Sequence, residues 1–234
     1  RELGDLAAAR GLRVCFEALA WGRFVNDHRD AWEIVRRANH PSIGLILDSF
    51  HALSRRIDPD TIRSIPGDRI FIVQLADAPL IDMDLLYWSR HFRNFPGQGD
   101  LDVLGFMQAL DTTGYDGLLS LEIFNDQFRA GSARSVAVDG RRSLIALADQ
   151  LRVKTGRTFP SLPALPPRSQ CLGTEFIEFA ADASEAPALE KLIATLGFQK
   201  AGQHISKAVT RWTQGSINLV INSEAEGFAH SYNI

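Results

Sequence analysis

The sequence is poor in the residues that would cross-link the chain or carry it to a charged or apolar surface. Its two cysteines, Cys15 and Cys171, lie far apart and form neither a CxxC pair nor a disulfide framework. It shows no signal peptide and no transmembrane run. The formal net charge is -3, and no basic stripe or basic amphipathic helix is present, which argues against a nucleic-acid or membrane surface. We expect a cytoplasmic protein with reduced thiols.

Four short apolar runs are present instead, and each is broken by one side chain that bears oxygen. Such runs, rich in Ile, Leu and Val and without polar alternation, are typical of parallel strands buried on both faces. The segments between them have helical spacing, and Asn26 or Asp27 can cap the helix that follows. The oxygen-bearing residues, in the runs 13–22, 42–51, 69–79 and 117–126, are Glu17, Asp48, Gln74 and Glu122.

Alternating strands and helices predict an α/β fold with a parallel sheet. Glu17, Asp48 and Gln74 follow one another at intervals close to the roughly 30 residues of one unit in a ~250-residue (β/α)8 TIM barrel. The interval from Gln74 to Glu122 is longer, and we predict a further strand around residues 87–100. If Glu122 lies on the last strand, three strands are missing from the front of the barrel, and the chain opens without Met. We therefore expect a partial barrel, made of the later strands, cut from a longer protein.

The residues from about 155 onward show a different order of predicted elements. Residues 155–170 hold four of the ten prolines, a density that suits an extended linker. A strand, a helix with Ser184 as its expected cap, and two antiparallel strands that turn near Gly215 then predict the start of an α+β module. We therefore expect residues 1–155 to belong to the barrel, residues 156–170 to be the linker and residues 171–234 to be a truncated second module.

The four oxygen-bearing residues predict a metal site. In a parallel barrel the carboxyl ends of neighbouring strands converge on one face, so these side chains would point at one spot. Three carboxylates at one spot repel one another unless a cation lies between them. Oxygen ligands favour Mg²⁺ or Mn²⁺ over zinc, with Co²⁺ as a further alternative. The other explanation, that each residue is a strand end meeting solvent, requires the same coincidence four times.

Five segments carry a resemblance to a known family: FEALAWG, LILDSFH, FIVQLADAP, HFRNFPGQGD and SLEIFND. They resemble the later strands of the xylose-isomerase-like sugar-phosphate isomerase/epimerase barrels, and most closely those of the bacterial 3-dehydroshikimate dehydratases. In one branch of these enzymes the barrel is fused to a hydroxyphenylpyruvate-dioxygenase-like domain of the vicinal-oxygen-chelate type. The second half of the chain is similar to the first module of that domain, so the resemblance covers both sides of the linker.

The resemblance also implies a site, position by position. The family's metal ligands match the four residues named above, and the amide of Gln74, where many relatives have His, is characteristic of the dehydratase branch. His51 in DSFH matches a pocket histidine, and Arg93 in HFRNFPGQGD matches an arginine that anchors substrate. Ser89 lies nearby as a further substrate-binding candidate. The pattern GQG from Gly97 to Gly99 is too short to predict a phosphate cradle.

The chemistry that such a site supports follows from general principles. A divalent cation chelated by the two oxygens of a hydroxy-ketone stabilises the enediolate that forms when the α-proton leaves. Isomerases and epimerases return that proton, whereas a dehydratase expels the next hydroxyl and converts 3-dehydroshikimate into protocatechuate. His51 suits proton transfer because an unperturbed imidazole titrates near neutral pH, and Arg93 suits the substrate carboxylate because its donors are forked.

Three functions from different classes stay open at this point. The first is the metal-dependent dehydratase, and the second is a sugar or hydroxy-keto acid isomerase or epimerase that uses the same ligands. The third is a non-catalytic fragment. For the catalytic readings we expect a small-molecule substrate and neither nucleic acid nor membrane as a partner, and we leave homo-oligomer formation open.

Overall fold

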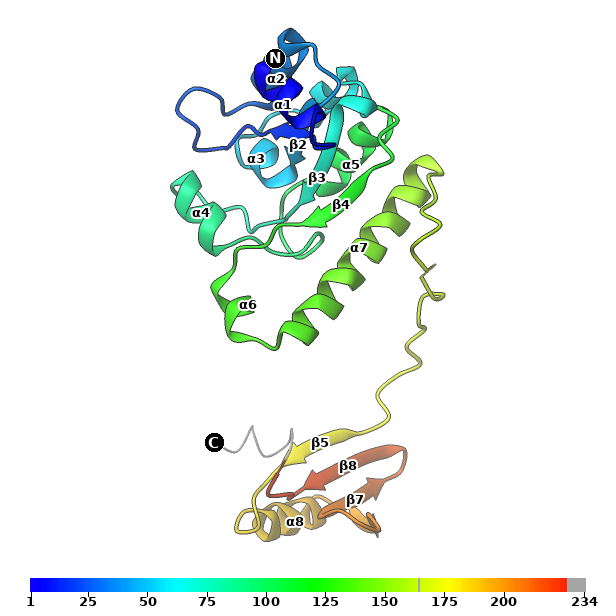
Figure 1. Ribbon diagram of the computed structural model, residues 1–234. Coiled ribbons are helices and arrows are strands. Elements are labelled where there is room, and N and C mark those ends of the chain that lie inside the picture. The colour runs from blue at the N-terminus through cyan, green and yellow to red at the C-terminus, as the bar shows by residue number, and fades with distance from the viewer. Residues whose placement is uncertain (164, 227–234) are drawn as a thin grey trace. The chain divides into compact units, whose positions relative to one another are not determined.

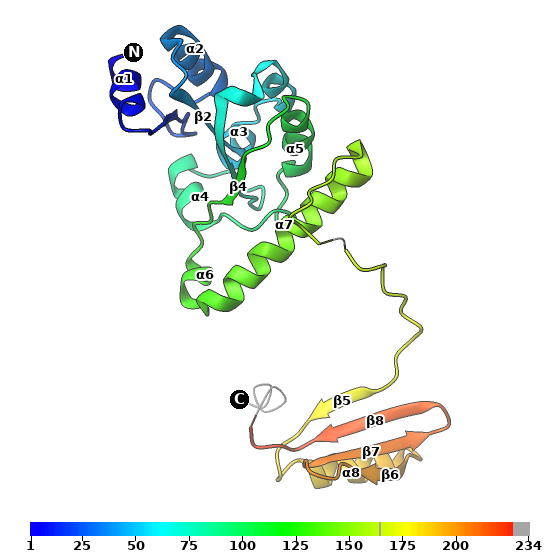
Figure 2. The same ribbon diagram turned by 45° about the vertical axis from the view of Figure 1, so that its right-hand side comes forward.

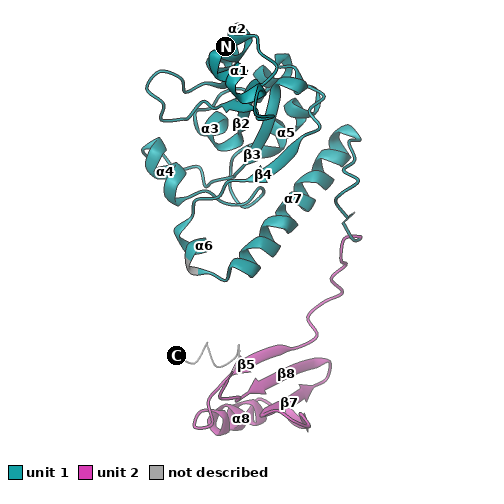
Figure 3. Cartoon of the chain, in the orientation of Figure 1, with its two compact units in different colours: residues 1–166 teal, residues 167–234 magenta. Residues whose placement is uncertain are grey.

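The computed structural model describes residues 1–163 and 165–226. The described residues form two compact units, one within Arg1–Pro166 and the other within 167–226, coloured separately in Figure 3. No helix in the described part of the chain combines the length and apolarity needed to cross a membrane.

A parallel sheet of four strands forms the centre of the first unit (Figure 1). Its spatial order, β1-β2-β3-β4, is also the order along the chain, and each neighbouring pair is parallel. The carboxyl ends of all four strands therefore lie at one edge of the sheet. The strands are β1 (Val14–Phe16), β2 (Ile43–Asp48), β3 (Ile70–Leu75) and β4 (Leu118–Leu121).

Helices and turns connect these strands. The Asp27 carboxylate accepts the N–H of Arg29 and begins α2, and Asn39, in the left-handed conformation, ends it. The long helix α7 packs against α5 (Figure 2). The elements are α1 (Glu2–Ala8), α2 (His28–Ala38), α3 (Ser49–Ser54), η1 (Pro59–Ser64), η2 (Gly67–Arg69), α4 (Leu85–His91), α5 (Val103–Asp111), α6 (Asp126–Ala130) and α7 (Ala133–Thr155).

The apolar runs of the central strands make the core of this unit. Leu45, Val73 and Leu75 are fully buried, and Phe106 of α5 packs into the same cluster. The edge strand β4 differs, because Leu118 is 75% exposed. Burial on both faces thus holds for the inner strands, where the sequence predicts it, and weakens at the edge.

The strand predicted around residues 87–100 is wrong. Asp84 caps a helix there, α4, by accepting the N–H of Tyr87, and a loop follows it. Its β-type pairing with the residues after the neighbouring strands is limited, in the described residues, to two isolated bridges, Asp77 with Asn94 and Phe92 with Asn125. β3 consequently pairs directly with β4, and the long interval in the sequence is filled by a helix and a loop rather than by a strand.

The second unit is a β-α-β-β-β module. β5 pairs with β8 in parallel, and the β8-β7 and β7-β6 pairs are antiparallel. Helix α8 packs Ile193 against Trp212, Leu219 and Ile221 of the sheet. The elements are β5 (Ile177–Ala180), α8 (Ala186–Thr195), β6 (Gln199–Gln203), β7 (Val209–Gln214) and β8 (Ile217–Asn222), in the sheet order β5-β8-β7-β6.

This module agrees with the α+β pattern of the sequence, including the turn at Gly215, whose φ is +57°. The predicted cap is wrong. α8 begins at Ala186, and the Ser184 side chain does not cap it. The carboxylate of Asp182 instead accepts the N–H groups of Ser184 and Glu185, because it lies where the chain turns into the helix.

Candidate metal centre

Four oxygen-bearing side chains meet at the carboxyl edge of the parallel sheet. Glu17 directly follows β1, Asp48 ends β2, Gln74 lies near the end of β3, and Glu122 directly follows β4. One potential ligand atom each from Glu17, Asp48, His51 and Glu122 lies within 4.8 Å of the others. The side-chain N–H of Gln74 donates to Oε1 of Glu122 over 3.1 Å, which brings the amide into the same group.

Two oxygens of this cluster are buried without a hydrogen-bond partner in the part of the chain that the structure describes. They are Oε1 of Glu17 and Oε1 of Gln74. Buried polar atoms are almost always paired in proteins, and an orphaned oxygen costs free energy. A divalent cation would satisfy both oxygens, so the donor set fits such an ion.

Asp48 is held in place by the first turn of α3. Its Oδ1 accepts the N–H of Phe50 over 2.7 Å and that of His51 over 3.3 Å, so it caps the helix. The same turn aims the His51 ring at the cluster, with Nε2 3.6 Å from Oε1 of Glu17. Local helix capping thus places the carboxylate and the imidazole together.

Arg93 supplies the positive charge of the cluster. Its Nη1 donates to Oδ2 of Asp48 and to Oε2 of Glu122, each over 2.8 Å. Its Nε and Nη2 donate to the hydroxyl of Ser89 over 3.1 and 2.8 Å. The residue is only 1% exposed. Arg93 therefore pairs with two of the four predicted metal ligands, a relationship that the sequence does not reveal.

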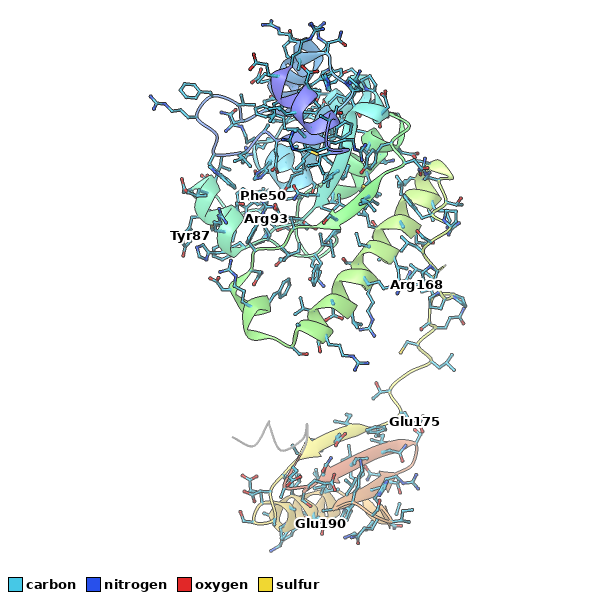
Figure 4. All side chains as sticks on the ribbon, viewed as in Figure 1. Phe50, Tyr87, Arg93, Arg168, Glu175 and Glu190 are labelled. Carbon is cyan, nitrogen blue, oxygen red and sulfur yellow. The ribbon has the colours of Figure 1, made fainter. Side chains whose placement is uncertain are left out.

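Aromatic rings surround the arginine and the histidine. The Arg93 guanidinium lies 4.6 Å from the ring centroid of Phe50 and 5.6 Å from that of Phe124. Figure 4 shows Phe50 and Arg93 close together in the first unit. Trp21 packs edge to face on His51, with 4.9 Å between ring centroids. Trp21 thus lines the cluster.

Burial and crowding of negative charge shift the acidities of the cluster. Burial, and then the charges of Asp48 and Glu122, raise the pKa of Glu17 to about 7. The pKa of Glu122 is also raised, chiefly by burial and by Asp48. Burial, and then the positive charge of Arg93, lower the pKa of His51 to about 3, so the ring is neutral. Repulsion of this kind is what a bound cation relieves.

Sequence reasoning missed two residues that hold this site. Asp77 is 1% exposed and lies after β3, and Asn125 is 9% exposed and lies after β4. The side chain of Asn125 donates to the backbone oxygen of Arg93 over 3.2 Å. The signal available for Asp77 was an acid placed, like the ligands, just beyond the apolar run of a strand.

Comparison with known proteins identifies the family. The family described as "Xylose isomerase-like TIM barrel" matches residues 1–147, and the chain belongs to it. The description "Hydroxyphenylpyruvate dioxygenase, HPPD, N-terminal" matches residues 168–234, so the chain joins part of a barrel to a dioxygenase-like module. Both parts of the fold expected from the sequence are thereby confirmed.

Individual relatives share this fused architecture. The chain is 51% identical over 237 aligned residues to the 3-dehydroshikimate dehydratase of Pseudomonas putida. The match covers 99% of this chain and 37% of the relative. The chain thus spans little more than a third of that relative's length. A solved "xylose isomerase-like TIM barrel/4-hydroxyphenylpyruvate dioxygenase fusion protein" is 50% identical, with a TM-score of 0.79, over 98% of this chain and 38% of that one.

A second solved structure concerns the barrel alone. It is described as an "IOLI protein with a binding zinc atom" and is 26% identical, with a TM-score of 0.59. The match covers 64% of this chain and 54% of that chain.

Proposed function

We propose that the chain carries the active site of a metal-dependent lyase that dehydrates 3-dehydroshikimate to protocatechuate and water. The observation that supports this most is the meeting of three carboxylates and one amide at the carboxyl edge of the sheet, with two buried oxygens left for a cation. The identity to a 3-dehydroshikimate dehydratase along almost the whole chain supports the choice of substrate.

The roles of the metal ligands follow from the chemistry of the donor set. Glu17, Asp48, Gln74 and Glu122 would hold the ion. All four offer oxygen, so we propose Mg²⁺ or Mn²⁺, with Co²⁺ as an alternative. The bound ion would act as a Lewis acid on two neighbouring substrate oxygens. Zinc is the competing identity, because a relative of the barrel has been solved with it.

His51 is our candidate for proton transfer. Its Nδ1 accepts the N–H of Ala20 over 3.2 Å, and its Nε2 faces the cluster. Nε2 is therefore the atom that exchanges a proton with the substrate: we propose that it takes the α-proton as a base, and that the imidazolium so formed gives this proton to the hydroxyl that leaves as water. To take a proton at Nε2 the neutral ring must first carry its hydrogen on Nδ1, which requires the bond to Ala20 to open.

Arg93 and Ser89 are our candidates for substrate binding. The N–H groups of Arg93 already donate to Asp48, Glu122 and Ser89. A substrate carboxylate would thus bind by displacing one of these acceptors. Ser89 is the neutral acceptor among them: in the described residues its hydroxyl accepts from Arg93 and donates to no other group. We therefore propose that the substrate carboxylate replaces Ser89 as the acceptor of the Nη2 hydrogen bond.

An isomerase or epimerase of sugars or hydroxy-keto acids is the alternative, because the family is named for an isomerase and the ligand set permits either reaction. A non-catalytic role is the third. The complete gene product, assayed for protocatechuate with and without chelator and for isomerisation of a panel of sugars and hydroxy-keto acids, separates the three. Chelator-sensitive protocatechuate formation supports the dehydratase, and an isomerised substrate supports the isomerase or epimerase. The absence of both products supports the non-catalytic role.

We propose domain limits of 1–155 for the barrel part, 156–170 for the linker and 171–234 for the dioxygenase-like module. We also propose a cytoplasmic enzyme that binds neither nucleic acid nor membranes. Sedimentation of the complete gene product would decide whether it forms a homo-oligomer.

A further inference from the structure

The buried carboxylate of Asp77 accepts four backbone N–H groups. Its Oδ1 accepts from Ala78 over 2.8 Å and from Leu101 over 3.0 Å. Its Oδ2 accepts from Gly97 and Gly99, each over 3.0 Å. Backbone N–H groups that converge in this way make a concave anion site, and here the anion belongs to the chain itself. The backbone N–H groups of Gly97 and Gly99, which a phosphate would need, thus already bind the Asp77 carboxylate.

The glycines are required for this arrangement. Gly97 has a φ of +83°, a backbone conformation that residues other than glycine rarely adopt. A Cβ on Gly99 would lie 2.5 Å from the backbone oxygen of Ala78 and would press on the Asp77 carboxylate. The loop can therefore close around Asp77 only with glycine at these places.

The same loop begins with Arg93. The backbones of Asp77 and Asn94 exchange two hydrogen bonds of 2.9 and 2.7 Å. On the other side, the side chain of Asn125 donates to the backbone oxygen of Arg93 and to Oδ1 of Asn94, and the Arg93 N–H donates to the backbone oxygen of Phe124 over 3.1 Å. The segment that carries the guanidinium is thus fixed between the ends of β3 and β4.

We propose that Asp77 is a positioning residue that sets Arg93 against the acidic cluster by closing the 94–101 loop. The inference deepens the proposed function and rests on it for the substrate that Arg93 binds. A guanidinium that must meet Asp48, Glu122 and Ser89 at once tolerates little displacement. Asp77 itself makes no contact with those three side chains among its hydrogen bonds, so its effect on substrate passes through the loop.

The test replaces Asp77 by Asn in the complete gene product. An amide keeps one acceptor oxygen but turns its NH₂ group toward two backbone donors, so half of the bonds are lost at almost unchanged volume. We expect the KM for 3-dehydroshikimate to rise at least about tenfold with kcat changed less than about threefold, because Arg93 contributes binding in ground and transition states alike. The amides of Gly97, Gly99 and Leu101 should exchange hydrogen at least about tenfold faster.

Asp102→Ala is the matched control. Asp102 accepts a backbone N–H too, from Gly105 over 2.8 Å, and caps α5 beyond the loop. Its loss should lower thermal stability and leave KM within about twofold. The inference is overturned if Asp77→Asn speeds hydrogen exchange of the loop amides while KM stays within twofold of the wild-type value. It is also overturned if Asp102→Ala raises KM as much as Asp77→Asn does.

Two further measurements keep the outcome decisive. Should Asp77→Asn fail to fold, Asn125→Asp replaces it, since this change keeps the cap on Gln127 but removes the donors to Arg93 and Asn94. It should raise KM in the same way, and an unchanged KM overturns the inference. If the wild-type protein does not turn over 3-dehydroshikimate, the proposed function fails by itself. The protected NMR signal of the Arg93 guanidinium then decides: it should be lost in Asp77→Asn, and its retention overturns the inference.

Discussion

The backbone N–H of Ala20 donates a hydrogen bond of 3.2 Å to Nδ1 of His51. Because a backbone amide is always a donor, Nδ1 is the unprotonated nitrogen of the neutral ring, and the proton lies on Nε2. Nε2 faces Oε1 of Glu17 at 3.6 Å. The tautomer of the proposed proton carrier is thus fixed from outside the acidic cluster.

Replacing His51 by Ala should lower turnover by roughly 10² to 10⁴, the range typical of acid-base groups. Metal occupancy, measured by elemental analysis of the dialysed protein, should stay near normal. His40→Ala is the control, because His40 also accepts a backbone N–H at Nδ1 but lies away from the cluster. Since His51 has an atom within reach of the same ion, loss of metal in His51→Ala would make it a ligand and not the proton carrier.

Replacing Glu122 by Gln should weaken metal binding by at least about tenfold, with activity falling in parallel. The change keeps size and oxygen but removes one negative charge from the cluster and one ion pair from Arg93. Calorimetric titration of the metal-free protein measures the affinity. Glu33→Gln, which removes an exposed carboxylate paired with Arg36 and Arg37, should leave it unchanged. Undiminished affinity in Glu122→Gln would remove Glu122 from the ligand set.

Replacing Arg93 by Ala should raise KM more than it lowers kcat, since Arg93 holds a carboxylate present in ground and transition states. It should also destabilise the metal-free protein by about 3–5 kcal/mol, because the fully buried Asp48 side chain loses its ion-pair partner. Urea unfolding with and without metal measures this, and added metal should recover part of the loss. A KM equal to that of the wild type would end the proposal that Arg93 binds substrate.

Alkaline pH should destabilise the first unit through Tyr115. Its hydroxyl donates to the backbone oxygen of Leu118 over 2.7 Å, and burial raises its pKa to about 12, whereas an unfolded tyrosine titrates near 10. Between these values the unfolded chain has lost the proton and the folded chain has kept it, so stability falls as pH rises from about 10 to about 12. Urea midpoints at rising pH should fall less steeply for Tyr115→Phe than for the wild type. Equal slopes would contradict the prediction.

The sequence predicts much of the first unit because its inner strands are short, apolar and buried on both faces. The acids and the amide that end these runs could be placed at one edge, since the carboxyl ends of parallel strands share an edge. The segment after Gln74 could not be predicted in this way. Its residues Tyr87 and Trp88 suit a strand as well as a helix, and the Asp84 cap that selects the helix is a single polar residue.

The pairing of Arg93 with Asp48 was also beyond the sequence. The two residues are far apart along the chain, and they meet only because α4 and the loop held by Asp77 return to the sheet edge. A resemblance can assign Arg93 to substrate, but only the folded chain shows that its donors are already in use. Tertiary contacts of this kind leave no periodic signal in the sequence.

The amide at Gln74 has a consequence for the charge of the loaded site. With their protons removed, the carboxylates of Glu17, Asp48 and Glu122, together with the guanidinium of Arg93, carry a net charge of -2. A divalent ion makes this sum zero. A carboxylate in place of the Gln74 amide would leave the loaded site negative, and it would repel an anionic substrate. Electroneutrality thus explains why a ligand that gives oxygen without charge suits a site whose proposed substrate is itself an acid.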